Sequence, residues 1–265
     1  KRFATTAKVS LPWLTALLFL FFFQGAVYYH LMVCVVLVLL GYRKDKPIRT
    51  LVFVLLASAW AGISRVNWMP VPGLMAVALY LLDTPFDSKK WVKYLLWPAV
   101  WVIGGFAVAY LTKQGYIAIS GEDPALFDSA FSSALLWRRL LPNATFFLGI
   151  LPAILLVILP GAASTWLKFR QKSLPALHWL QWLGLTGILG VFFAGGLVVS
   201  VKIGGGGDLH NLDGFLVFWA LIVGGILAMS SRLPDPKVKA NENHAWRFWL
   251  AVAVIVPSFF AFMRS

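Results

Sequence analysis

A run of glycines and polar residues between two apolar segments holds the densest set of potentially reactive groups in this chain. It reads Lys202-Ile-Gly-Gly-Gly-Gly-Asp-Leu-His-Asn-Leu-Asp213. Each glycine in a helix interior costs about 1 kcal/mol relative to alanine, so four in succession predict a loop. Successive N–H groups without side chains can cradle a phosphate, and Lys202 would add positive charge. The predicted phosphate-binding residues here are Lys202, Gly204, Gly205, Gly206 and Gly207.

The same run has two structural alternatives. It can be a tight turn between two helices, although two glycines would suffice for a turn. It can also be a small-residue contact between helices, although these glycines fall at the end of a span. The run lacks the Gly-Lys-Ser/Thr end of a Walker loop, and no strand precedes it as in a dinucleotide-binding fingerprint.

Two carboxylates close to the glycines are candidate catalytic groups. Asp208 and Asp213 could accept a proton from a sugar hydroxyl. They could instead bind a divalent cation, so the sequence does not identify the cofactor. Asp213 has an equal structural alternative as the N-cap of the following span. His210 could act as a base, but His30 and His178 are too scattered in sequence to complete a metal site, and no metal ligands are assigned.

A second polar stretch carries further candidates. Glu122 and Asp123 are carboxylates that could also supply a base. Arg138 and Arg139 form an adjacent basic pair that could bind a lipid phosphate. Pairing with a nearby acidic residue or with lipid headgroups is the equal alternative for both arginines.

The composition identifies the environment that must position these residues. The chain is 60% hydrophobic and only 12% charged, whereas soluble domains are about half apolar and a quarter charged. This predicts an all-α polytopic membrane protein. Its net charge of +13 comes from Lys and Arg in short loops, as the positive-inside bias requires, and not from nucleic-acid binding. A single cysteine, Cys34, excludes an intrachain disulfide.

The apolar segments predict seven to nine transmembrane or re-entrant helices in a single helical domain over 1–265. They cover 11–23, 31–41, 50–63, 70–82, 91–112, 145–167, 178–201, 214–230 and 248–263. Two long polar connections remain between them, 113–144 and the glycine-rich loop 202–214.

The 113–144 connection predicts a helix that lies in the membrane interface. Asp123-Pro124 is typical of an N-cap followed by proline at the first helical position. Apolar residues then recur at helical spacing on one face. They are Phe127, Ala130, Phe131, Ala134 and Leu135.

The distribution of charge predicts the orientation. If nine segments alternate from an inside N-terminus, 17 of the 23 Lys and Arg residues fall on inside loops. The glycine-rich loop and the 113–144 connection then face the extracytoplasmic side, in what we interpret as a bacterial plasma membrane. The chain opens Lys1-Arg2-Phe3 without methionine, so we expect a processed product or the back part of a longer protein.

The pattern from Lys202 to Phe215 resembles a known family. A span ending in a basic residue, four glycines, a turn with an asparagine and another span are similar to the C-terminal part of bacterial GT-C membrane glycosyltransferases. The likeness covers 90–230 in layout but only about a dozen residues in motif. The resemblance implies a polyprenyl-phosphate-linked sugar donor used on the extracytoplasmic side. It is carried by Gly204–Gly207, with Asn211 as a weaker match for the phosphate site.

One departure from that family limits the resemblance. The family's catalytic acid sits in the first outer loop, yet neither Gln24–His30 nor Ser64–Met69 contains a carboxylate. We therefore expect either that the front of the protein lies outside this chain or that catalysis has been lost. The resulting hypotheses are a GT-C-like glycosyltransferase, or its C-terminal part, and a non-catalytic membrane subunit that scaffolds a larger complex. The expected partners are membrane lipid, a polyprenyl-phosphate sugar and other protein subunits, without nucleic acid.

Overall fold

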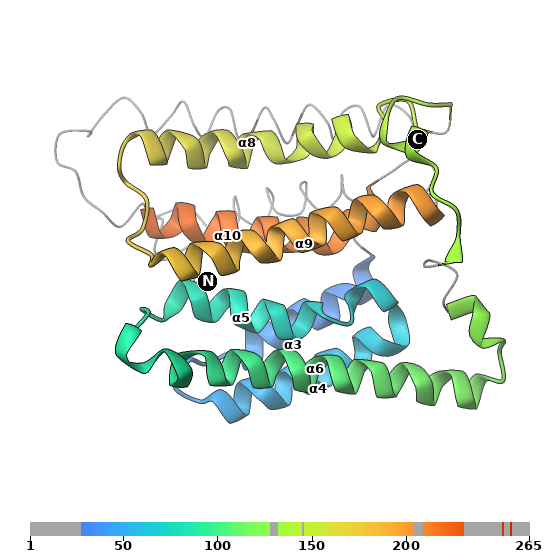
Figure 1. Cartoon of the computed structure of the whole chain (residues 1–265), viewed down its shortest axis with the longest axis horizontal. Helices are drawn as coiled ribbons and strands as arrows, with labels where there is room; N and C mark the ends of the chain where they lie inside the picture. The colour runs from blue at the N-terminus through green and yellow to red at the C-terminus, as the bar shows by residue number, and fades with distance from the viewer. Residues whose placement is uncertain are drawn as a thin grey trace. The chain divides into compact units, whose positions relative to one another are not determined.

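The computed structural model describes residues 28–127, 132–144, 146–203, 209–230, 251 and 255. Over these residues it contains helices and no strands, and six helical segments are long and apolar enough to cross a membrane. The chain is therefore an all-α polytopic membrane protein. The α-helices (Figure 1) are α3 (Met32–Gly41), α4 (Pro47–Ser64), α5 (Val71–Asp83), α6 (Trp91–Ser120), α8 (Ile150–Arg170), α9 (Trp179–Ile203) and α10 (Asp213–Ser230). Short 3₁₀ helices are η1 (Tyr29–Leu31), η2 (Val66–Trp68), η3 (Ser88–Lys90), η4 (Pro124–Phe127), η5 (Trp137–Leu140) and η6 (His210–Leu212).

Hydropathy predicted most of these helices well. Six of the seven α-helices begin and end within five residues of a predicted apolar segment. The predicted segments 11–23 and 248–263 lie outside the described residues, apart from residues 251 and 255.

Helix α6 extends eight residues beyond its predicted end at 112. The sequence there turns polar at Lys113, which the prediction took as the edge of the span. The helix continues to Ser120, and the Lys113 side chain is buried, with 8% of its surface exposed. Gly121 then adopts the left-handed conformation, with a φ of 71°, and ends the helix.

The chain divides into two compact units. Of the described residues, the α4 unit comprises 28–127, 132–135 and 177–195. The α10 unit comprises 136–144, 146–176, 196–203 and 209–230 together with residues 251 and 255. Helix α9 therefore contributes its first part to the α4 unit and its last part to the α10 unit.

The α4 unit is held together by close approach of helix backbones. Helix α4 packs against α3, α5 and α6, and α5 also packs against α6. A methyl group at Gly62 of α4 would overlap the carbonyl oxygen of Ala109 on α6, and one at Gly105 would come within 2.9 Å of the Ser58 hydroxyl. Small residues matter here because lipid is as apolar as the helices, so van der Waals contact must supply the attraction.

A buried glutamine joins the beginning of α9 to the end of α5. The Gln181 side-chain nitrogen donates to the carbonyl oxygens of Leu81 at 2.6 Å and Thr84 at 2.9 Å. Its side-chain oxygen accepts from the backbone N–H of His178 at 2.9 Å, while the His178 ring nitrogen Nδ1 accepts from Leu180 N–H at 3.3 Å. This reciprocal arrangement is a capping box, and it satisfies N–H groups at the start of α9 and carbonyls at the end of α5.

In the α10 unit, α8 packs against α10. A methyl group at Gly161 of α8 would come within 2.9 Å of the Trp219 indole nitrogen on α10. Of the apolar stretch that contains α10, 72% of the residues are buried, against 22% for the stretch that contains α6. Helix α10 is therefore an interior helix, whereas α6 leaves most of its surface for lipid.

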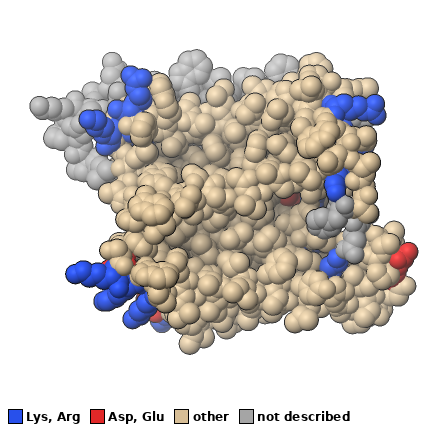
Figure 2. All heavy atoms as spheres, in the orientation of Figure 1, with Lys and Arg blue, Asp and Glu red and all other residues tan. Residues whose placement is uncertain are grey.

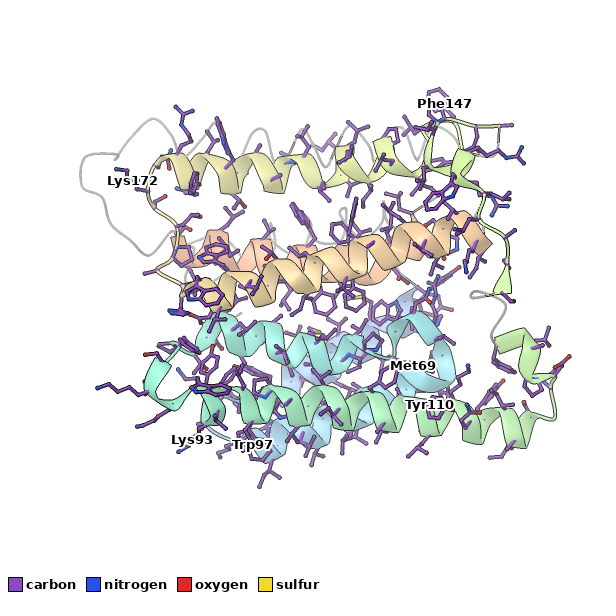
Figure 3. All side chains as sticks on the ribbon, viewed as in Figure 1. Met69, Lys93, Trp97, Tyr110, Phe147 and Lys172 are labelled. Carbon is purple, nitrogen blue, oxygen red and sulfur yellow. The ribbon has the colours of Figure 1, made fainter. Side chains whose placement is uncertain are left out.

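Charged and apolar side chains are segregated along the helices. Figure 2 shows the Lys and Arg side chains gathered at helix ends, with a broad surface of other residues along the helix lengths. Large apolar side chains along the helices are exposed, such as Leu56 on α4 and Ile103 on α6, at 55% and 70%. In Figure 3, Lys93 and Trp97 lie near the beginning of α6 and Tyr110 lies further along it. This is the pattern expected of helices surrounded by lipid.

Candidate functional site

The end of α9 brings together residues that are far apart in sequence. Lys202 lies in the last turn of α9. The Arg139 guanidinium of η5 donates to the carbonyl oxygen of Lys202 at 3.3 Å, and Leu136 N–H donates to the carbonyl oxygen of Val201 at 3.1 Å. The structure thus places Arg139, one of the predicted arginine pair, beside Lys202, which lies two residues before the glycine run.

The three cations at this position differ in exposure. Arg138 is exposed, whereas Arg139 and Lys202 are half-buried. The predicted cradle Gly204–Gly207 and the adjacent Asp208 lie outside the described residues.

The second half of the predicted loop is packed, not exposed. Asn211 and Asp213 have only 6% and 1% of their surfaces exposed, and Leu212 is fully buried. A methyl group at Gly196 of α9 would overlap the Leu212 side chain and come within 3.1 Å of the Asn211 carbonyl oxygen. The bare backbone at Gly196 therefore lets η6 lie directly against α9. His210, at the start of η6, is half-buried.

Asp213 is the first residue of α10, one position inside the helix compared with the predicted N-cap. Its carboxylate accepts from the Gly214 N–H at 2.7 Å. A negative charge in the first turn complements the positive end of the helix dipole. The predicted N-cap role of Asp213 is not observed, because Asp213 already has helical backbone angles as the first residue of α10. A carboxylate this deeply buried in an apolar helix is also an expected marker of function.

The other two carboxylate candidates belong to the α4 unit, whereas Lys202 and Arg139 belong to the α10 unit. Glu122 and Asp123 are both exposed. The Asp123 carboxylate accepts from the Ala125 N–H at 2.9 Å, at the start of η4. The predicted capping role of Asp123 is confirmed.

The predicted interfacial helix is shorter than expected over the described residues. The turns η4 and η5 are 3₁₀ helices, and the backbone at 134–136 is not helical. Residues 128–131 lie outside the described part of the chain. The predicted apolar face therefore does not continue to Leu135 as a single helix. Hydrogen bonds from η5 to the end of α9 hold this region in a different conformation.

The connection between η5 and α8 depends on an asparagine that the sequence analysis missed. The Asn143 side-chain nitrogen donates to the carbonyl oxygens of Leu141 at 2.9 Å and Arg139 at 3.4 Å, and its oxygen accepts from Phe146 N–H at 2.9 Å. Figure 3 shows Phe147 in this connection and Lys172 at the other end of α8. Proline followed by asparagine at 142–143 is a turn signal that could have identified it.

The chemistry of this site favours an anion. Within the described ranges, no three His, Cys, Asp or Glu side chains come together in a way that could hold a metal ion. The Arg139 guanidinium instead lies at the end of α9, and Arg138 and Lys202 belong to the two segments that this contact joins. Guanidinium and ammonium groups form charge-assisted hydrogen bonds with phosphate. Comparison with protein-family models, curated proteins and solved structures finds no match to this chain.

Proposed function

We propose that this chain is a GT-C-like membrane glycosyltransferase, or the C-terminal part of one. It transfers a sugar from a polyprenyl-phosphate donor to a cell-envelope acceptor, on the extracytoplasmic side of a bacterial plasma membrane. The observation that carries the proposal is the hydrogen bond from the Arg139 guanidinium to the Lys202 carbonyl, because it brings together two basic segments, η5 with Arg138 and Arg139 and the last turn of α9 with Lys202. Such a concentration of charge on an outer face runs against the positive-inside bias and suits a lipid phosphate.

The reaction requires two kinds of group. A carboxylate takes the proton of the acceptor hydroxyl, whose oxygen attacks the anomeric carbon of the sugar. The bond between that carbon and the phosphate oxygen breaks, and polyprenyl phosphate leaves with the electron pair. Lys202, Arg138 and the N–H groups of Gly204–Gly207 would stabilise the leaving phosphate. Asp208 and Asp213 are the carboxylates nearest in sequence to this phosphate site.

The experiment is sugar transfer by the full chain in native membranes, supplied with polyprenyl-phosphate-linked sugars. Lys202→Ala should lower transfer by about 10- to 100-fold, because a charge-assisted contact to the leaving phosphate is lost. Asp208→Ala should also lower transfer if that carboxylate is the base. Arg170→Ala is the matched control, because Arg170 lies at the end of α8 that is away from η5. Unchanged transfer in both site variants would remove this assignment.

One observation favours a second candidate function. The carboxylates of Asp123 and Asp213 each accept a backbone N–H at the start of a helix, which is a structural use. A chain whose carboxylates serve its own helices suits a non-catalytic membrane subunit that scaffolds a larger complex. The absence of transfer from every donor, together with copurification of a stoichiometric partner, would select this alternative.

A further inference from the structure

The C-terminal end of α9 has carbonyl groups that its own helix cannot satisfy. The last four carbonyls of any α-helix lack intrahelical partners. Two of those in α9 are satisfied by η5 and the residue before it, because Leu136 N–H donates to the Val201 carbonyl and the Arg139 guanidinium donates to the Lys202 carbonyl. A cation at this position also complements the negative end of the helix dipole. Arg139 therefore acts as a cap for α9 that comes from 63 residues earlier in the chain.

The turn that presents Arg139 is itself fixed. Arg139 N–H donates to the Leu136 carbonyl at 3.0 Å, and the Arg139 carbonyl accepts from the Asn143 side chain at 3.4 Å. The Asn143 backbone N–H also donates to the Phe146 carbonyl oxygen at 3.1 Å, across the same turn. Arg139 is thus held from both sides, and its guanidinium is directed to the end of α9.

The neighbouring arginine is placed differently. The Arg138 side chain is exposed, whereas Arg139 is half-buried against α9. The two adjacent arginines therefore have different roles, although the sequence presents them as an equivalent pair.

We propose that Arg139 is a positioning residue that fixes the end of α9 and hence the position of Lys202, while Arg138 meets the phosphate of the lipid directly. This division of roles rests on the proposed glycosyltransferase function. It predicts that Arg139 affects the rate of transfer through the position of α9, and that Arg138 affects the affinity for the donor.

The experiment compares five variants of the full chain in lipid nanodiscs. Arg139→Ala removes the cap, and Arg139→Lys keeps the charge but loses the planar fork of donors. Asn143→Ala loosens the same turn without changing any charge. Arg138→Ala removes the exposed arginine, and Arg170→Ala serves as an exposed-arginine control. Each protein is measured by hydrogen–deuterium exchange and by kcat and KM for polyprenyl-phosphate-linked sugar donors.

We expect Arg139→Ala to lower exchange protection at the Leu136 amide by about tenfold, because a hydrogen bond to a charged group is lost beside it. Its kcat should fall while the donor KM changes little, Asn143→Ala should reproduce both effects, and Arg139→Lys should restore part of each. Arg138→Ala should raise the donor KM several-fold without changing exchange.

Two results would overturn the positioning role. One is unchanged exchange at Leu136 in Arg139→Ala. The other is a normal kcat in Asn143→Ala beside a reduced kcat in Arg139→Ala, since Arg139 would then act through its charge. If the unaltered protein transfers no sugar from any donor, the proposed function and the catalytic part of this role both fail. The exchange measurement still decides separately whether Arg139 holds the end of α9.

Discussion

Individual charged residues in this protein lie at helix ends of opposite partial charge. Lys202 occupies the last turn of α9 and Asp213 the first turn of α10, so each complements the dipole of its helix. The residue types were evident from the sequence, but their burial was not. Burial of Asn211 and Asp213 depends on η6 lying against α9 at Gly196, a contact between segments that no local pattern encodes.

Two adjacent glycines of α9 provide a direct test of that contact. Gly196→Ala should destabilise the protein by about 1–3 kcal/mol, because the new methyl group would overlap the Leu212 side chain. Gly195→Ala is the matched control, since nothing lies within 4 Å of the position that its methyl group would occupy. It should be neutral or slightly stabilising. Thermal unfolding in detergent measures both, and equal midpoints for the two variants would refute the close approach.

At the scale of elements, the sequence predicted the helices that follow from hydropathy. It missed the conformations that depend on hydrogen bonds between distant segments. Helices α4 and α5 lie close to their predicted apolar segments because a lipid-facing helix must be continuously apolar. The predicted end of α6 was wrong, because a helix does not stop at the first polar residue. Gly121 ends α6 instead. The conformation of η5 could not be predicted, because it depends on carbonyls of α9 more than 60 residues away in sequence.

At the scale of the whole molecule, the proposed orientation requires the two ends of α8 to face opposite sides of the membrane. Two exposed alanines flank this helix, Ala144 before it and Ala176 after it. In a background with Cys34 replaced by alanine, a cysteine at 144 should react with a membrane-impermeant maleimide on intact cells. A cysteine at 176 should react only after permeabilisation, because the basic residues at that end of α8 favour the cytoplasm. The reverse labelling pattern would place the candidate site on the wrong side.

The central claim is that the cations at the end of α9 recognise a lipid phosphate. The most direct measurement compares the binding of a polyprenyl phosphate and of the matching polyprenol to the full chain in zwitterionic nanodiscs. We expect the phosphate to bind about 10- to 100-fold more tightly, as charge-assisted hydrogen bonds of roughly 1.5–3 kcal/mol imply. Lys202→Ala should remove most of this difference, and Arg170→Ala should leave it intact. Equal affinity for the two lipids in the unaltered protein would contradict the claim.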